Sequence, residues 1–234
     1  MLIREAAGVF WQTFRDIWEE LLPLAVVNLV WLLAWAAPLS GGSLLASIPA
    51  LAIVLIVIAV LVFAVATAGV YYVAYRVAHA KTFHFSDFVE GARLYWWRAI
   101  LWILGNVLII VVLAANVLFY ARIAANWSAI VAGLFVALFI VWVAVQVYFW
   151  PLLLAQEEPK LFLAWRNAFY LLLANPFYAF FIVSFSILLL GLSIGLTLPF
   201  VLMGMTLQGL LGNNAVLVLL ERLGKIESPR PKMS

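Results

Sequence analysis

The sequence predicts an all-α, polytopic membrane protein whose six transmembrane helices form three hairpins, each preceded by a cytoplasmic amphipathic helix. Of the 234 residues, 68% are hydrophobic and 10% are charged, whereas soluble domains have roughly half apolar and about a quarter charged residues. The chain contains six apolar stretches long enough to cross a hydrocarbon core of ~30 Å. When these stretches are taken as spans, twelve of the thirteen Lys and Arg residues fall on one side of the membrane.

The six predicted spans cover residues 21–39, 48–76, 99–121, 129–151, 177–197 and 200–220. Each is expected to be an α-helix, because a backbone surrounded by lipid must satisfy its own hydrogen bonds. The apolar stretch 44–78 is unusually long, since its 35 residues would extend ~52 Å as a helix. Pro49 suits the first turn of a helix, so residues 44–48 are expected to form a turn. Whether one long helix or a broken one follows stays open.

Amphipathic segments precede the first, third and fifth spans. Residues 1–20 predict a helix on the inner leaflet, with its charged side chains in water and an apolar stripe of Ile3, Ala7, Phe10, Phe14 and Ile17. Ser86 is expected to cap the second amphipathic helix, and Pro159 to open the third. Aromatic residues recur at intervals of 74, at Phe14, Phe88 and Phe162. This spacing fits either a true repeat or three similar interfacial helices.

The basic residues predict the orientation and the domain boundaries. Only Arg122 lies in a loop on the opposite side from the other Lys and Arg residues. The positive-inside rule therefore places both termini in the cytoplasm. The predicted parts are an interfacial helix at 1–20, a six-span domain at 21–221 and a basic cytoplasmic tail at 222–234. Because the basic residues cluster beside spans, they predict topology and no nucleic-acid partner.

Ionisable groups inside a membrane domain usually mark enzymes and ion-coupled carriers. No predicted span has an Asp, Glu or Lys in its interior, and the chain has no cysteine. His79 and His84 lie in a predicted cytoplasmic turn, with Asp87 and Glu90 nearby. A surface metal site there is an alternative, but a solvated polar turn explains these residues. We therefore expect no catalytic residue, no metal site, no cofactor and no enzymatic activity.

Neutral amides are the polar groups that remain in the spans. The candidate ligand-binding residues are Asn28, Asn106, Gln146, Gln208, Asn213 and Asn214. The simpler interpretation is hydrogen bonding between helices, which contributes about 0.6 kcal/mol per bond in membranes. The adjacent pair Asn213 and Asn214, together with Gln208, is the best candidate for a site. Neighbouring residues on a helix point in different directions, so at least one of the pair should face a polar group.

Small residues predict where helices pack closely. Gly191 and Gly195 form a GxxxG motif in the fifth span, and the sixth span contains Gly204, Gly209 and Gly212. We expect these glycines to pack the fifth span against the sixth around the turn at Pro199. Dimerisation through the same residues is the alternative, and the oligomeric state stays open.

Several segments resemble the YesL-like family of bacterial multi-pass membrane proteins, which contains a domain of unknown function. These segments are Ala37–Gly42, Thr67–Arg76, Phe85–Phe88, Phe149–Leu153, Trp165–Phe169 and Ala174–Pro176. The resemblance extends over most of residues 21–220, although about 40 positions carry it. The resemblance implies a protein of the cell (inner) membrane, from a family often encoded near carbohydrate uptake systems, and it implies no catalytic residues.

These observations lead to a functional hypothesis with one main alternative. We expect a non-catalytic membrane accessory or scaffold, with the lipid bilayer and a membrane transporter complex for solute uptake as partners. The link to solute uptake comes from the family resemblance alone. The alternative is a facilitator or carrier for a neutral solute that uses the amides of the spans. A lipid-modifying enzyme is the least favoured reading, because catalytic groups are not found at depth.

Overall fold

The computed structural model describes residues 2–227 and 229, and all regular secondary structure in that range is α-helix. Its helices are α1 (Leu2–Glu19), α2 (Leu21–Leu44), α3 (Pro49–Ala78), α4 (Phe85–Ala121), α5 (Asn126–Leu154), α6 (Leu161–Ala174), α7 (Pro176–Leu196) and α8 (Leu198–Arg222). All except α1 and α6 are long and apolar enough to cross a membrane. The protein is therefore an all-α, multi-pass integral membrane protein, as predicted. Arg230 and Lys232 of the predicted tail lie outside the described residues, and Arg222 belongs to α8.

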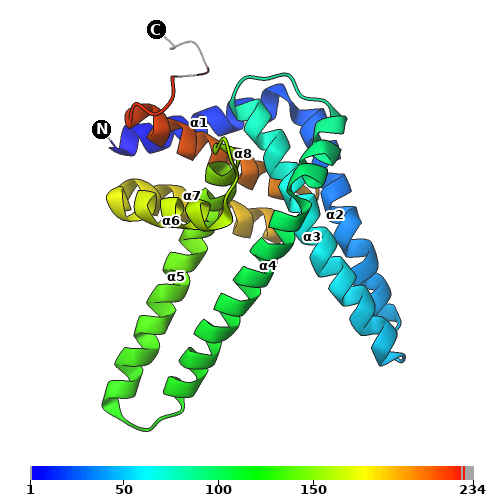
Figure 1. Ribbon diagram of the computed structural model, residues 1–234, viewed down its shortest axis with the longest axis vertical. Helices are drawn as coiled ribbons and strands as arrows, with labels where there is room; N and C mark the ends of the chain where they lie inside the picture. The colour runs from blue at the N-terminus through cyan, green and yellow to red at the C-terminus, as the bar shows by residue number, and fades with distance from the viewer. Residues whose placement is uncertain (1, 228, 230–234) are drawn as a thin grey trace.

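The two hairpins α2–α3 and α4–α5 project in the same direction from a body that contains α1, α6, α7 and α8 (Figure 1). Their turns lie at the far end, and α1, the α3–α4 loop and the end of α8 lie at the opposite end. Arg122 follows α4 in the distal turn. This arrangement agrees with the partition of basic residues in the sequence, and the identity of the cytoplasmic face stays a prediction.

The long apolar stretch 44–78 contains a turn followed by one continuous helix. α2 runs through Pro38 to Leu44, beyond the predicted end at residue 39. Residues 45–48 form the turn, and α3 begins at Pro49, as expected from the tolerance of proline in a first helical turn. The 30 residues of α3 would span ~45 Å, so this helix is longer than the ~30 Å hydrocarbon core.

The expectation of a separate amphipathic helix before the third span is wrong. α4 runs without interruption for 37 residues from Phe85 to Ala121, so the amphipathic segment is its first part. His84, rather than Ser86, is the N-cap residue, and its backbone N–H donates to the Oδ2 of Asp87, three residues further on, at 2.7 Å. The segment before the fifth span does form its own helix, α6, which begins two residues after Pro159.

α1 forms a helix as predicted, and the face that the protein covers overlaps the predicted apolar stripe only in part. Its buried side chains are Ala6, Val9, Thr13, Asp16 and Ile17. Of the predicted stripe, Ala7 is exposed and Phe14 is 47% exposed, whereas Phe10 stacks on Phe185 of α7 with ring centroids 3.8 Å apart. The side chain of Ile3 lies outside the described residues. Phe10 and Ile17 of the predicted stripe thus pack on the protein, and the placement of the exposed Ala7 and Phe14 at the membrane surface stays a prediction.

Glycines allow close contacts between several pairs of helices. A Cβ added to Gly69 would lie 2.6 Å from the Phe88 carbonyl oxygen, and one on Gly91 would lie 2.4 Å from the Tyr72 Cβ. α3 and α4 therefore cross with their backbones nearly touching. In α8, a Cβ on Gly209 would lie 3.0 Å from the Ala74 Cβ.

Of the glycines predicted to pack helices together, Gly212 contacts another helix, whereas Gly191, Gly195 and Gly204 do not. A Cβ on Gly212 would lie 2.6 Å from the Val147 carbonyl oxygen, so α8 packs tightly on α5. Gly204 lies against Phe200 of its own helix, and Gly191 and Gly195 have nothing within 4 Å. The expectation that this glycine set packs α7 against α8 is therefore wrong. The close partners of α8 at Gly209 and Gly212 are α3 and α5, and the GxxxG motif of α7 faces outward.

Candidate functional site: the polar contacts around α8

Asn28 of α2 binds the backbone of α8 with both ends of its amide. Its Nδ2 donates to the carbonyl oxygens of Phe200 and Val201 at 2.9 and 2.8 Å. Its Oδ1 accepts from the backbone N–H groups of Met205 and Thr206 at 2.8 and 3.2 Å. The side chain is fully buried, with 0% exposure. Asn28 therefore joins successive turns of α8 and fixes α2 against them.

Asn106 and Gln146 form a reciprocal pair of contacts between α4 and α5. The Trp102 Nε1 donates to the Gln146 Oε1 at 2.9 Å, and the Trp142 Nε1 donates to the Asn106 Oδ1 at 3.0 Å. Each helix carries its Trp and its amide four residues apart, which places both on one face. Because the helices are antiparallel neighbours in a hairpin, the two pairs meet in opposite order. Both amides also donate to the carbonyl of the Trp in their own helix.

Gln208 links α8 to α7. Its Nε2 donates to the Ser186 carbonyl oxygen at 2.9 Å, and the Ser186 hydroxyl donates to the Gln208 Oε1. Both the donor and the acceptor of this amide thus form hydrogen bonds between α8 and α7.

Asn214 contacts a carboxylate that sequence reasoning did not place inside the protein. The Asn214 Nδ2 donates to the Asp16 Oδ2 at 2.8 Å and to the Thr13 Oγ1 at 3.2 Å. The Asp16 Oδ1 accepts from the Gln12 Nε2 at 2.8 Å, and Asp16 is only 4% exposed. No predicted span has an Asp, Glu or Lys in its interior, but α1 brings the Asp16 carboxylate into the protein interior beside α8.

A pattern in the sequence could have indicated this contact. Val9, Thr13 and Asp16 follow one another at steps of four and three, so they form a second face of α1 beside the aromatic stripe. An asparagine inside an apolar span requires a polar partner. Those two observations together match a polar face of α1 with Asn214.

Asn213 points away from its neighbour, as expected for adjacent positions on a helix. Its Nδ2 donates to the Gly209 carbonyl oxygen at 2.8 Å, within α8. It lines a cavity of about 60 Å³ together with Tyr75, His79 and Pro151. A cavity of this volume holds a few water molecules, whereas pockets for small molecules usually have about 300–1,000 Å³.

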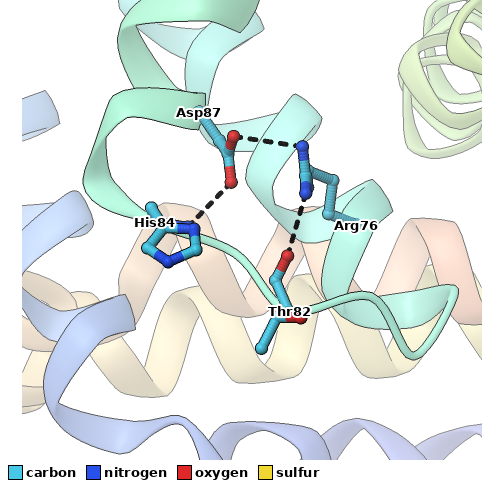
Figure 2. A network of polar contacts seen from close by, with 4 residues as sticks. All are labelled: Arg76, Thr82, His84 and Asp87. Atoms are coloured by element: carbon cyan, nitrogen blue, oxygen red, sulfur yellow. Dashed lines mark hydrogen bonds and ion pairs between the residues drawn. The ribbon is translucent and has the colours of Figure 1, made fainter.

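An ion pair closes the turn between α3 and α4 (Figure 2). The Arg76 Nη1 lies 3.1 Å from the Asp87 Oδ1, and the Arg76 Nη2 donates to the Thr82 carbonyl oxygen at 2.9 Å. The other carboxylate oxygen of Asp87 accepts from the His84 backbone. Asp87 is therefore used to position α4 on α3. A metal ion at this turn would have to displace the guanidinium from Asp87.

The buried polar atoms that lack a hydrogen bond in the described chain are chiefly aromatic. They include the Tyr148 hydroxyl and the indole N–H groups of Trp35, Trp150 and Trp165. None of the six candidate amides belongs to this set. The described chain thus binds its own amides and leaves mainly aromatic donors unpaired.

Comparison of the chain with models of protein families, with curated proteins and with solved structures gave no match. The resemblance to the YesL-like family therefore stays a prediction based on the sequence segments named above.

Proposed function

We propose that this integral membrane protein is a non-catalytic accessory or scaffold that acts through the outer surfaces of its helices. The observation that supports this proposal is the use of the candidate amides within the chain. Asn28, Asn106, Gln146, Gln208, Asn213 and Asn214 each form at least one hydrogen bond to another part of the protein. Five of the six connect different helices, which is the role of structural amides in membranes.

A carrier for a neutral solute is less well supported by these contacts. A solute would have to compete with bonds such as the four that Asn28 forms with α8. Asn213 has free volume beside it, but about 60 Å³ is much smaller than a sugar-sized pocket. The geometry around α8 therefore favours a rigid framework over a binding pathway.

The α4–α5 hairpin is the surface best suited to bind a partner. Its distal half projects from the body of the protein (Figure 1). Large apolar side chains there are 55–64% exposed, including Leu104, Leu108, Val111, Leu134 and Ile140. Within a bilayer, helix association depends on packing of such surfaces. We therefore assign the partner, which the family resemblance suggests is a solute-uptake complex, to this hairpin.

Purification from native membrane tests this proposal. The wild-type chain is extracted with its surrounding lipid, and proteins that are retained with it are identified. Val111→Trp adds bulk on the hairpin, and Leu188→Trp is the control because Leu188 is similarly exposed on α7. We expect a multi-pass membrane protein to be retained with the wild type and with Leu188→Trp. With Val111→Trp, most of this retained partner should be lost.

A transport assay provides the opposing outcome. The purified protein is placed in liposomes, and uptake of neutral sugars is measured with and without Asn213→Leu. Uptake that this substitution abolishes, in a variant that still folds and inserts, would establish the carrier and contradict the scaffold.

A further inference from the structure

A groove lies between the α4–α5 hairpin and α6. It has a volume of about 400 Å³, within the range of small-molecule sites. Figure 1 shows α6 lying across the upper part of α5, so the groove is bounded by the hairpin and by this crossing helix. Its wall is formed by side chains from all three helices, including Ile109, Leu113, Val141, Val145, Phe162 and Phe169.

The stretch of α4 from its contact with α6 to Leu113 is comparable in length with one leaflet of a bilayer. Trp165 of α6 packs over Gly105, where an added Cβ would lie 2.9 Å from the Trp165 ring. Leu113, at the wall of the groove, is eight residues further along α4, which corresponds to ~12 Å of helix. Half of a ~30 Å hydrocarbon core is similar in depth. A chain aligned with the hairpin would therefore fit from α6 into the apolar layer.

The chemistry of the wall favours a hydrocarbon chain. The groove exposes apolar atoms only, so even Arg166 contributes its methylene stem. A peptide would bring N–H and C=O groups into this groove without hydrogen-bond partners, which is strongly unfavourable in a membrane. An acyl chain carries no such groups and gains from burial of its methylenes.

The charge at the edge of the groove selects the headgroup. Arg166 is exposed on α6 and forms no ion pair or hydrogen bond within the described part of the chain. A guanidinium at the end of an apolar stem reaches toward the interface, where it can bind a phosphate with two parallel hydrogen bonds. We propose that the groove binds an anionic phospholipid, with an acyl chain between the α4–α5 hairpin and α6 and the phosphate on Arg166.

Native mass spectrometry of the full chain in the presence of equal amounts of phosphatidylglycerol and phosphatidylcholine tests the headgroup. We expect the wild type to retain phosphatidylglycerol in preference to phosphatidylcholine. Arg166→Gln lowers this preference about fivefold, as expected for one basic residue at a membrane surface. Arg93→Gln is the matched control, because Arg93 is also exposed and unpaired in the described chain but lies outside the groove. No preference in the wild type, or equal losses in both variants, overturns the proposal.

A second pair of variants tests the acyl chain. Val141→Trp fills the groove, whereas Val143→Trp adds the same ring on α5 outside it. We expect Val141→Trp to remove the retained lipid and Val143→Trp to keep it. Thermal unfolding, monitored by circular dichroism, tests whether each variant is folded. Retention of the lipid by folded Val141→Trp shows that it binds elsewhere and overturns the proposal.

Discussion

Asn28 is the side chain whose loss should affect the framework most. It forms four hydrogen bonds with the backbone of α8, and hydrogen bonds between membrane helices contribute about 0.6 kcal/mol each. We therefore expect Asn28→Leu to lower the free energy of unfolding by about 2 kcal/mol. Reversible unfolding in mixed micelles measures the change.

Asn116 supplies the control for this substitution. Its amide donates only to the Val112 carbonyl oxygen of its own helix, at 2.8 Å. Asn116→Leu should change the free energy of unfolding by less than about 0.5 kcal/mol. Similar losses for the two variants would show that the contacts of Asn28 with α8 contribute little.

Asp16 is the buried carboxylate that holds α1 on the body of the protein. Removing it takes away one of the two acceptors of the Asn214 amide and the acceptor of the Gln12 amide, and an unsatisfied buried group costs about 1–3 kcal/mol. We expect Asp16→Ala to release α1, so that its backbone amides exchange hydrogen about tenfold faster. Hydrogen exchange with mass spectrometry measures this rate.

A surface ion pair on the same helix gives the comparison. Arg15 and Glu19 lie 2.7 Å apart, but both side chains are at least half exposed. Solvent screens such exposed pairs, so they contribute little to stability, and Glu19→Ala should leave the exchange of α1 nearly unchanged. Equal acceleration in both variants would mean that the burial of Asp16 has no special role.

The α4–α5 hairpin should depend on its reciprocal Trp–amide contacts. Trp142→Phe and Asn106→Leu remove the two partners of one hydrogen bond. A double-mutant cycle isolates their coupling, which we expect to be about 0.6 kcal/mol and at most about 1.7 kcal/mol. A coupling of zero, with both single variants folded, would show that apolar packing alone joins these helices.

Helical periodicity and apolar length were sufficient to predict the six spans, the start at Pro49 and the amphipathic segment that forms α6. They could not predict what covers each face. Asp16 and Asn214 are 198 residues apart, and the pattern around Asp16 looks like a solvated face until α8 lies beside it. The prediction that Gly191 and Gly195 pack α7 on α8 failed for the same reason. A stripe of small residues indicates that close packing is possible but does not identify the partner helix.

The continuity of α4 shows a second limit. The change from polar to apolar residues near Ala99 predicts a boundary, but no proline or strong cap interrupts the backbone there. Composition changes where the helix enters the membrane, and the helix itself continues. The amides were assigned to the right spans, whereas their partners required the arrangement in space.

The arrangement of the entire protein in the membrane gives the last prediction. The chain has no cysteine, so single cysteines can be introduced without removing others. Lys81→Cys, Glu157→Cys and Ala124→Cys place a thiol at exposed positions in three different loops. The excess of Lys and Arg on one side predicts that the first two loops are cytoplasmic and the third is external.

A membrane-impermeant maleimide should label the cysteine at position 124 in intact cells and should label the other two cysteines only after permeabilisation. The same label applied to denatured protein controls for expression and reactivity. Labelling of positions 81 and 157 from outside, with position 124 protected, would show that the protein has the opposite topology. It would also place Arg166 in the outer leaflet and contradict the positive-inside assignment.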